Sequence, residues 1–144
     1  MPAYASLSDM TARYGEQLLI GLTDRGAVAT GEIDEALVTK ALADATETID
    51  GYLRAAGYVT PLAAVPGNIA DLCQSIAIWK LYVTEAPEKI TTDYRDAVRA
   101  LEAISKGVIK LAVAGVEPAS TGSSGVQVTD RERPLTEATM KGFI

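Results

Sequence analysis

The hydrophobic pattern between Ile69 and Val83 predicts a helix at the centre of the fold. Eleven of these fifteen residues are apolar. Two sets of them recur at helical spacing and fall on different sides of such a helix. A helix that is apolar on both sides must be covered on both sides. The broader set comprises Ile69, Leu72, Cys73, Ile76, Trp79 and Val83, and the narrower one Ile78, Leu81 and Tyr82.

Apolar stripes of helical period predict further helices on both sides of this central one. Two short helices are expected over residues 4–15 and 16–22, the second with Leu18, Leu19 and Leu22 on one side. A long helix is expected over 32–56, and another over about 91–106. The apolar stripe of this last helix comprises Tyr94, Ala97, Val98, Leu101, Ile104 and Val108. Glycine is expected to end three of these helices, at Gly15, Gly57 and Gly107. The sequence therefore predicts an all-α fold, a small bundle of about four to five helices.

Side chains that accept backbone hydrogen bonds mark the expected beginnings of these helices. The expected N-caps are Ser6 or Ser8, Thr30 or Asp34, Asn68, and Thr91 or Thr92. Pro87 is expected to stop the central helix at about Thr84.

The long helix is expected to exceed what the core of so small a domain requires, because 25 residues span about 37 Å. Its apolar stripe faces the core, and its polar side carries Asp44 and Glu47. Part of this helix is therefore expected to contact another protein. The stripe comprises Val38, Ala41, Leu42, Ala45, Ile49, Tyr52, Leu53 and Ala56.

The composition changes after Gly115, which divides the chain into a helical bundle at residues 1–115 and a linker with a C-terminal arm at 116–144. Residues 117–125 are rich in Gly and Ser, as flexible linkers are. Residues 126–129 alternate like a short strand. The apolar residues beyond the linker predict an arm that docks on a partner; the alternative is that it folds back on its own bundle.

Charge and cysteine content narrow the functional class. The net charge is −6, and residues 1–57 account for −5 of it. Nucleic-acid binding requires clustered Lys and Arg, and the chain has no such cluster. The acidic surface serves solubility or repels DNA. Because the chain has one cysteine, it cannot form an internal disulfide. It has no signal-peptide pattern and no apolar run long enough to cross a bilayer. We therefore expect an intracellular protein without membrane contact.

Catalytic and metal-binding chemistry is not favoured by the sequence. The chain has no histidine, the commonest general base and metal ligand. Cys73 falls on the central apolar stripe, where a thiol is inert. Asp44, Glu47 and Asp50 lie near one another on the long helix, where solvated carboxylates are the expected state. The glycine-rich stretches match neither the P-loop nor the dinucleotide fingerprint. We therefore expect no enzyme, no cofactor and no metal.

Short segments along the whole chain, in this order and spacing, resemble those of a known family. Near the start these are Tyr4, Leu7 and residues 18–23, and in the long helix residues 41–45 and 49–53. Val65-Pro66 precedes the central helix, which contributes residues 76–77 and 81–82. Then follow Tyr94, Leu101, Ile104 and Gly107, and near the end of the chain residues 133–136 and 140–143. Together they resemble the small head–tail connector proteins, also called adaptor or head-completion proteins, of Mu-like tailed phages and prophages.

This resemblance implies a structural protein of the virion neck, assembled in the host bacterial cytoplasm. Such proteins bind the portal as a ring, typically of twelve copies, extend the DNA channel without binding DNA specifically, and offer a platform for the next neck or tail protein. On this interpretation the acidic Asp44 and Glu47 line the lumen. The arm residues expected to bind the portal or a neighbouring copy are Val126, Val128, Arg131, Arg133, Leu135, Met140, Phe143 and Ile144.

An alternative of a different class is a small helical regulatory protein that binds a host or phage protein through its C-terminal tail. It predicts a monomer or dimer and no ring. A third, a small enzyme with a carboxylate site, is made improbable by the missing histidine. If the protein is present in virions at fixed stoichiometry, the connector is favoured. If it is present only in the cytoplasm of infected cells, the regulatory protein is favoured.

Overall fold

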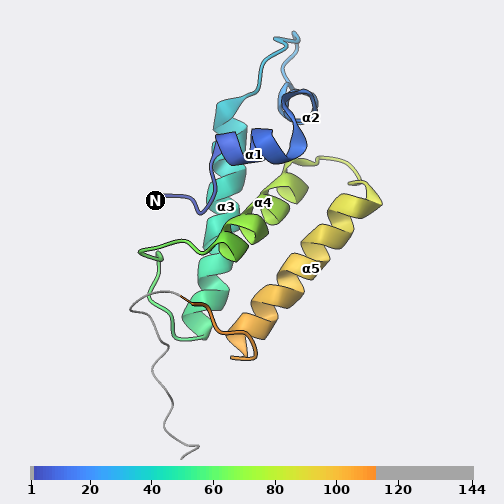
Figure 1. Cartoon of the computed structure of the whole chain (residues 1–144). Helices are drawn as coiled ribbons and strands as arrows, with labels where there is room; N and C mark the ends of the chain where they lie inside the picture. The colour runs from blue at the N-terminus through green and yellow to red at the C-terminus, as the bar shows by residue number, and fades with distance from the viewer. Residues whose placement is uncertain (1, 113–144) are drawn as a thin grey trace, which may run out of the picture.

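The computed structural model describes residues 2–112, which form five α-helices (Figure 1). This part of the chain contains no strand. The fold is therefore small and all-α, as the periodicity predicts. The linker, the arm and its strand-like segment lie outside the described residues. The helices are α1 (Leu7–Tyr14), α2 (Glu16–Thr23), α3 (Glu35–Ala55), α4 (Gly67–Leu81) and α5 (Glu88–Ser105).

Helix α4 is the central helix. It packs against α3 and α5 along its length and also contacts α1, and Figure 1 shows α3 and α5 on its two sides. Six consecutive residues, 73–78, are buried, so both sides of the helix are covered. Cys73, Ile76 and Ile78 have no exposed surface.

Helices α1 and α2 form a short pair that begins at a complete capping box. The Ser6 hydroxyl accepts the Asp9 N–H, and the Asp9 carboxylate accepts the Ser6 N–H. Gly15 lies between the two helices at φ 87°, a conformation that glycine adopts without the steric cost of a Cβ. Leu19 is fully buried, whereas Leu18 is 37% exposed, so the expected apolar side of this helix is only partly in the core.

Helix α3 begins at Asp34 and is the longest helix. The Asp34 carboxylate accepts the N–H groups of Ala36 and Leu37, and Gly57 follows its end at φ 88°. The predicted stripe is buried except for Tyr52 and Ala56, which are partly buried.

The predicted N-caps of α4 and α5 are wrong, by two residues for α4 and by four or five residues for α5. The residues at the two N-cap positions are Pro66 and Pro87, and neither helix has a side-chain cap. A proline carbonyl receives the first helical N–H in each case: Pro66 accepts from Ala70 at 3.2 Å and Pro87 from Thr91 at 3.0 Å. The proline ring holds φ near −65°, and φ is −62° at Pro66 and −53° at Pro87; the chain enters both helices without Asn68 or Thr91 as a cap.

Two residues assigned to apolar stripes lie outside the core. Val83 is 74% exposed and Val108 is 77% exposed, because α4 ends at Leu81 and α5 at Ser105. Beyond each helix end the 3.6-residue spacing no longer sets the side-chain direction.

Candidate assembly surfaces

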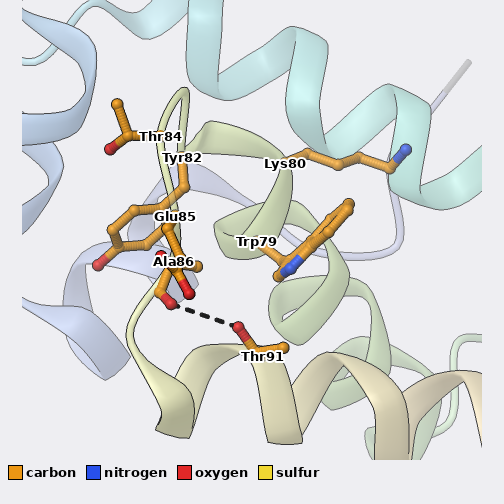
Figure 2. Close-up of a pocket in the computed structure, with 7 residues that line it drawn as sticks. All are labelled: Trp79, Lys80, Tyr82, Thr84, Glu85, Ala86 and Thr91. Carbon is orange, nitrogen blue, oxygen red and sulfur yellow. Dashed lines mark hydrogen bonds between the residues drawn. The ribbon is translucent and has the colours of Figure 1, made fainter.

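An open groove of about 420 Å³ lies where α4 ends and α5 begins (Figure 2). Beside it the rings of Trp79 on α4 and Tyr94 on α5 are stacked, with centroids 4.0 Å apart and planes 10° from parallel. The connection between the helices closes one side, held by a 3.4 Å hydrogen bond from the Thr91 hydroxyl to the Ala86 carbonyl. The groove is lined by Trp79, Lys80, Tyr82, Thr84, Glu85, Ala86 and Thr91.

The chemistry of this groove suits contact with a side chain of another protein. Figure 2 shows the side chains of Tyr82 and Lys80 extending to opposite sides of Trp79, with Lys80 directed toward α3. Aromatic faces flanked by one cation and one carboxylate can hold an apolar or amphipathic side chain. Trp79 and Tyr82 are both partly buried, so aromatic surface is already accessible to a partner.

Arg25 joins the helical pair to the end of α4. Its Nε donates to the Leu22 carbonyl at 2.7 Å, and its Nη2 donates to the Leu81 carbonyl. These carbonyls belong to the last turns of α2 and α4, where helices leave acceptors unsatisfied. A guanidinium also complements the negative end of both helix dipoles. The sequence carries no signal for this role of Arg25, because the pattern around it is that of an ordinary loop.

The two acidic residues expected to line the lumen, Asp44 and Glu47, are exposed on the outer face of α3. Asp44 is 2.8 Å from Lys40, and Glu47 is 3.5 Å from Arg54. The hydrogen bond from Lys40 lowers the pKa of Asp44. The net charge of these four side chains is therefore zero. The structure does not test which surface lines a channel.

The acidic surplus of the N-terminal half gathers instead between α2 and the first turn of α3. Asp24, Glu32, Asp34 and Glu35 lie within twelve residues, with Arg25 as the single cation. Asp24 organises this connection, because its carboxylate accepts the N–H groups of Thr30 and Gly31, both at 3.0 Å. These backbone donors lower the pKa of Asp24.

Asp50 departs from the expectation of a solvated carboxylate. It is 2% exposed, and its carboxylate accepts a hydrogen bond from the Tyr4 hydroxyl. The same hydroxyl accepts the Leu62 N–H at 3.0 Å. Burial, followed by the hydrogen bond to Asp50, raises the pKa of Tyr4 to about 12. Asp50 is thus a structural residue, buried where Asp44 and Glu47 are exposed.

Cys73 is a core residue, as predicted. It has no exposed surface, its Sγ lies 3.7 Å from the Thr46 hydroxyl, and burial raises the pKa of its thiol. Within residues 2–112 no three metal-ligating side chains converge. The helices of this region also lack the combination of length and hydropathy that crossing a bilayer requires.

The predicted arm residues lie outside the described part of the chain. They are Val126, Val128, Arg131, Arg133, Leu135, Met140, Phe143 and Ile144. The structure neither brings them together nor separates them, and their role stays a prediction.

Comparison with known proteins shows the relatives of this chain. A family model described as "Bacteriophage Mu, Gp36" matches residues 4–130. Gene product J of Escherichia phage Mu is 38% identical over 141 residues, which cover 98% of this chain and 99% of that protein. The Mu-like prophage FluMu protein gp36 of Haemophilus influenzae is 31% identical over 144 residues, the full length of both. The chain therefore belongs to the bacteriophage Mu Gp36 family.

Proposed function

We propose that this chain is a structural head–tail connector that binds the portal as a ring, extends the DNA channel and carries the next neck or tail protein. The observation that carries the proposal is membership of a phage Mu family along nearly the whole chain. This placement agrees with the resemblance noted from the sequence segments. In this role the protein is non-enzymatic and is located in the neck of the virion.

The architecture supports such a role in two ways. On the exposed face of α3, Lys40 pairs with Asp44 and Arg54 with Glu47, and a face without a cluster of free cations suits the wall of a channel that DNA passes without binding. Apolar residues such as Leu135 and Phe143 follow a Gly- and Ser-rich linker. We propose that this arm docks on the portal or a neighbouring copy, with apolar side chains as anchors.

Native mass spectrometry of the full chain, alone and mixed with the portal ring of the same phage, tests the proposal. We expect a complex of fixed stoichiometry with the portal. A variant lacking residues 134–144 is expected to lose portal binding and to keep its helical circular dichroism, because the described core lies within residues 2–112.

Two results would count against parts of this proposal. If the folded full chain does not associate with the portal, the small regulatory protein becomes the better hypothesis. If the shortened variant still binds, the arm does not provide the portal contact.

A further inference from the structure

An uncharged stretch of sixteen residues, 55–70, lies between Arg54 and Asp71. It comprises the end of α3, the connection to α4 and the first turn of α4. Much of this connection is nevertheless exposed: Val59 is 72% exposed and Val65 is 42% exposed. Exposed apolar surface without charges is typical of a contact site for another protein.

The segment that follows α5 adds further apolar surface at the same end of the bundle. Val108 is 77% exposed and Ile109 is 41% exposed, and the exposed Lys106 and Lys110 flank them. The Leu111 N–H donates to the Tyr58 hydroxyl at 3.1 Å, so this segment meets the α3–α4 connection. Figure 1 shows the C-terminal ends of α3 and α5 at one end of the molecule. We call the exposed residues Val59, Pro61, Val108 and Ile109 the apolar end.

The apolar end is held in place by buried neighbours. Tyr58, Leu62 and Leu111 are each at most 7% exposed. Backbone hydrogen bonds add to this anchoring. The Tyr58 N–H donates to the Leu53 carbonyl at 3.0 Å, and the Leu62 N–H donates to the Tyr4 hydroxyl at 3.0 Å. A surface fixed in this way loses little conformational entropy when a partner binds it.

We propose that the apolar end is the surface of the bundle that sits against the portal ring, on a patch of that ring that is itself apolar. This inference rests on the proposed function. The described chain leaves the bundle at this end, and residues 113–144 follow. Their 32 residues can extend at most about 110 Å. A partner bound by both the apolar end and the arm is held by two linked contacts, which raises the overall affinity.

A second copy of the chain fits this surface less well. Contact of the apolar end with the same surface of another copy is isologous and closes a two-fold dimer. Neighbours in a ring instead join two different surfaces of the subunit. A ring therefore does not pair the apolar end of one copy with the apolar end of another.

Four matched substitutions in the full chain test the inference. Val59→Asp and Val108→Asp place a carboxylate in the apolar end. Val28→Asp and Val83→Asp make the same change at valines that are 80% and 74% exposed in other connections. All four sites are exposed, so the variants are expected to fold, with unchanged circular dichroism as the check.

Binding to the purified portal ring is then measured by titration. We expect Val59→Asp and Val108→Asp to bind at least about tenfold more weakly, because a carboxylate would be buried without a partner. Val28→Asp and Val83→Asp are expected to bind like the unmodified chain.

The outcomes separate this inference from the proposed function. If the unmodified chain does not bind the portal, both fall together. If it binds and the two apolar-end variants bind equally well, only the inference is overturned. A loss of binding in the two control variants alone places the contact elsewhere on the bundle. A dimer of the free chain that Val59→Asp abolishes assigns the surface to a second copy instead.

Discussion

A single hydroxyl, that of Tyr4, ties three segments of the fold together. It donates to Asp50 on α3 and accepts the N–H of Leu62 in the α3–α4 connection, while the Tyr4 N–H donates to the Thr46 hydroxyl at 3.1 Å. These partners are 42 to 58 residues from Tyr4 in sequence. Periodicity assigned Cys73 correctly but gave no signal for Asp50, because a hydrogen bond across such a distance leaves no local pattern.

Replacing Tyr4→Phe is expected to lower the free energy of unfolding by about 2 kcal/mol, because a buried carboxylate and a buried N–H lose their partner. Thermal unfolding followed by circular dichroism measures the loss. Tyr52→Phe is the control, since the Tyr52 hydroxyl makes no hydrogen bond within residues 2–112. Equal stability of the two variants would contradict the structural role of Tyr4.

The raised pKa of Tyr4 also predicts a dependence on pH. A folded-state pKa of about 12 against an unfolded value of about 10 means that folding favours the neutral phenol. Its contribution is present below pH 10 and is lost as pH rises toward 12. The Tyr4→Phe variant is expected to lose less stability over this range than the unmodified chain.

At the scale of elements, the helix types and most of their ends follow from local chemistry. Ser6, Asp34, Gly15 and Gly57 act where the sequence analysis expects them. The end of α4 does not: it lies at Leu81 instead of about Thr84, and the Leu81 carbonyl accepts a hydrogen bond from Arg25 of another element. Helix ends set by tertiary contacts cannot be read from the residues beside them.

Arg25→Gln is expected to loosen α2 from the end of α4 and to lower stability by about 1 kcal/mol, because two carbonyls lose a charged donor. Hydrogen exchange of the α1–α2 pair is expected to rise more than that of α5. Arg99→Gln is the control, since the Asp96 partner of Arg99 lies at 3.4 Å and both side chains are exposed; such pairs contribute little. Unchanged exchange in α1 and α2 would show that Arg25 does not hold them.

At the scale of the whole molecule, the all-α class and the central position of α4 could be predicted, since burial on both sides appears directly as apolar residues on both sides. Much of the candidate surface could not. Val108 was assigned to a core stripe and is exposed, and the exposure of Val59 depends on which neighbours cover the connection. The arm residues lie outside the described region, so the fold does not test them.

The proposed channel leads to a prediction about charge on α3. Lys40, Asp44, Glu47 and Arg54 sum to zero, and Asp44→Lys with Glu47→Lys changes this sum to +4. If this face lines the lumen, the variant is expected to slow genome ejection, because DNA phosphates bind clustered cations. Ejection from purified virions provides the measurement. Raised salt should restore the rate through screening, and unchanged kinetics at low salt would exclude this face from the lumen.

The hydrogen bond from the Leu111 N–H to the Tyr58 hydroxyl has a mechanical consequence. Tension applied to the chain beyond Ala112 reaches this bond before it reaches the last turn of α5. Tyr58 is buried and bonded to the end of α3, so while this bond holds, part of the load passes into the longest helix as well as into the helix that precedes the exit. A subunit pulled from its C-terminal side is thus loaded through its most extensively packed elements.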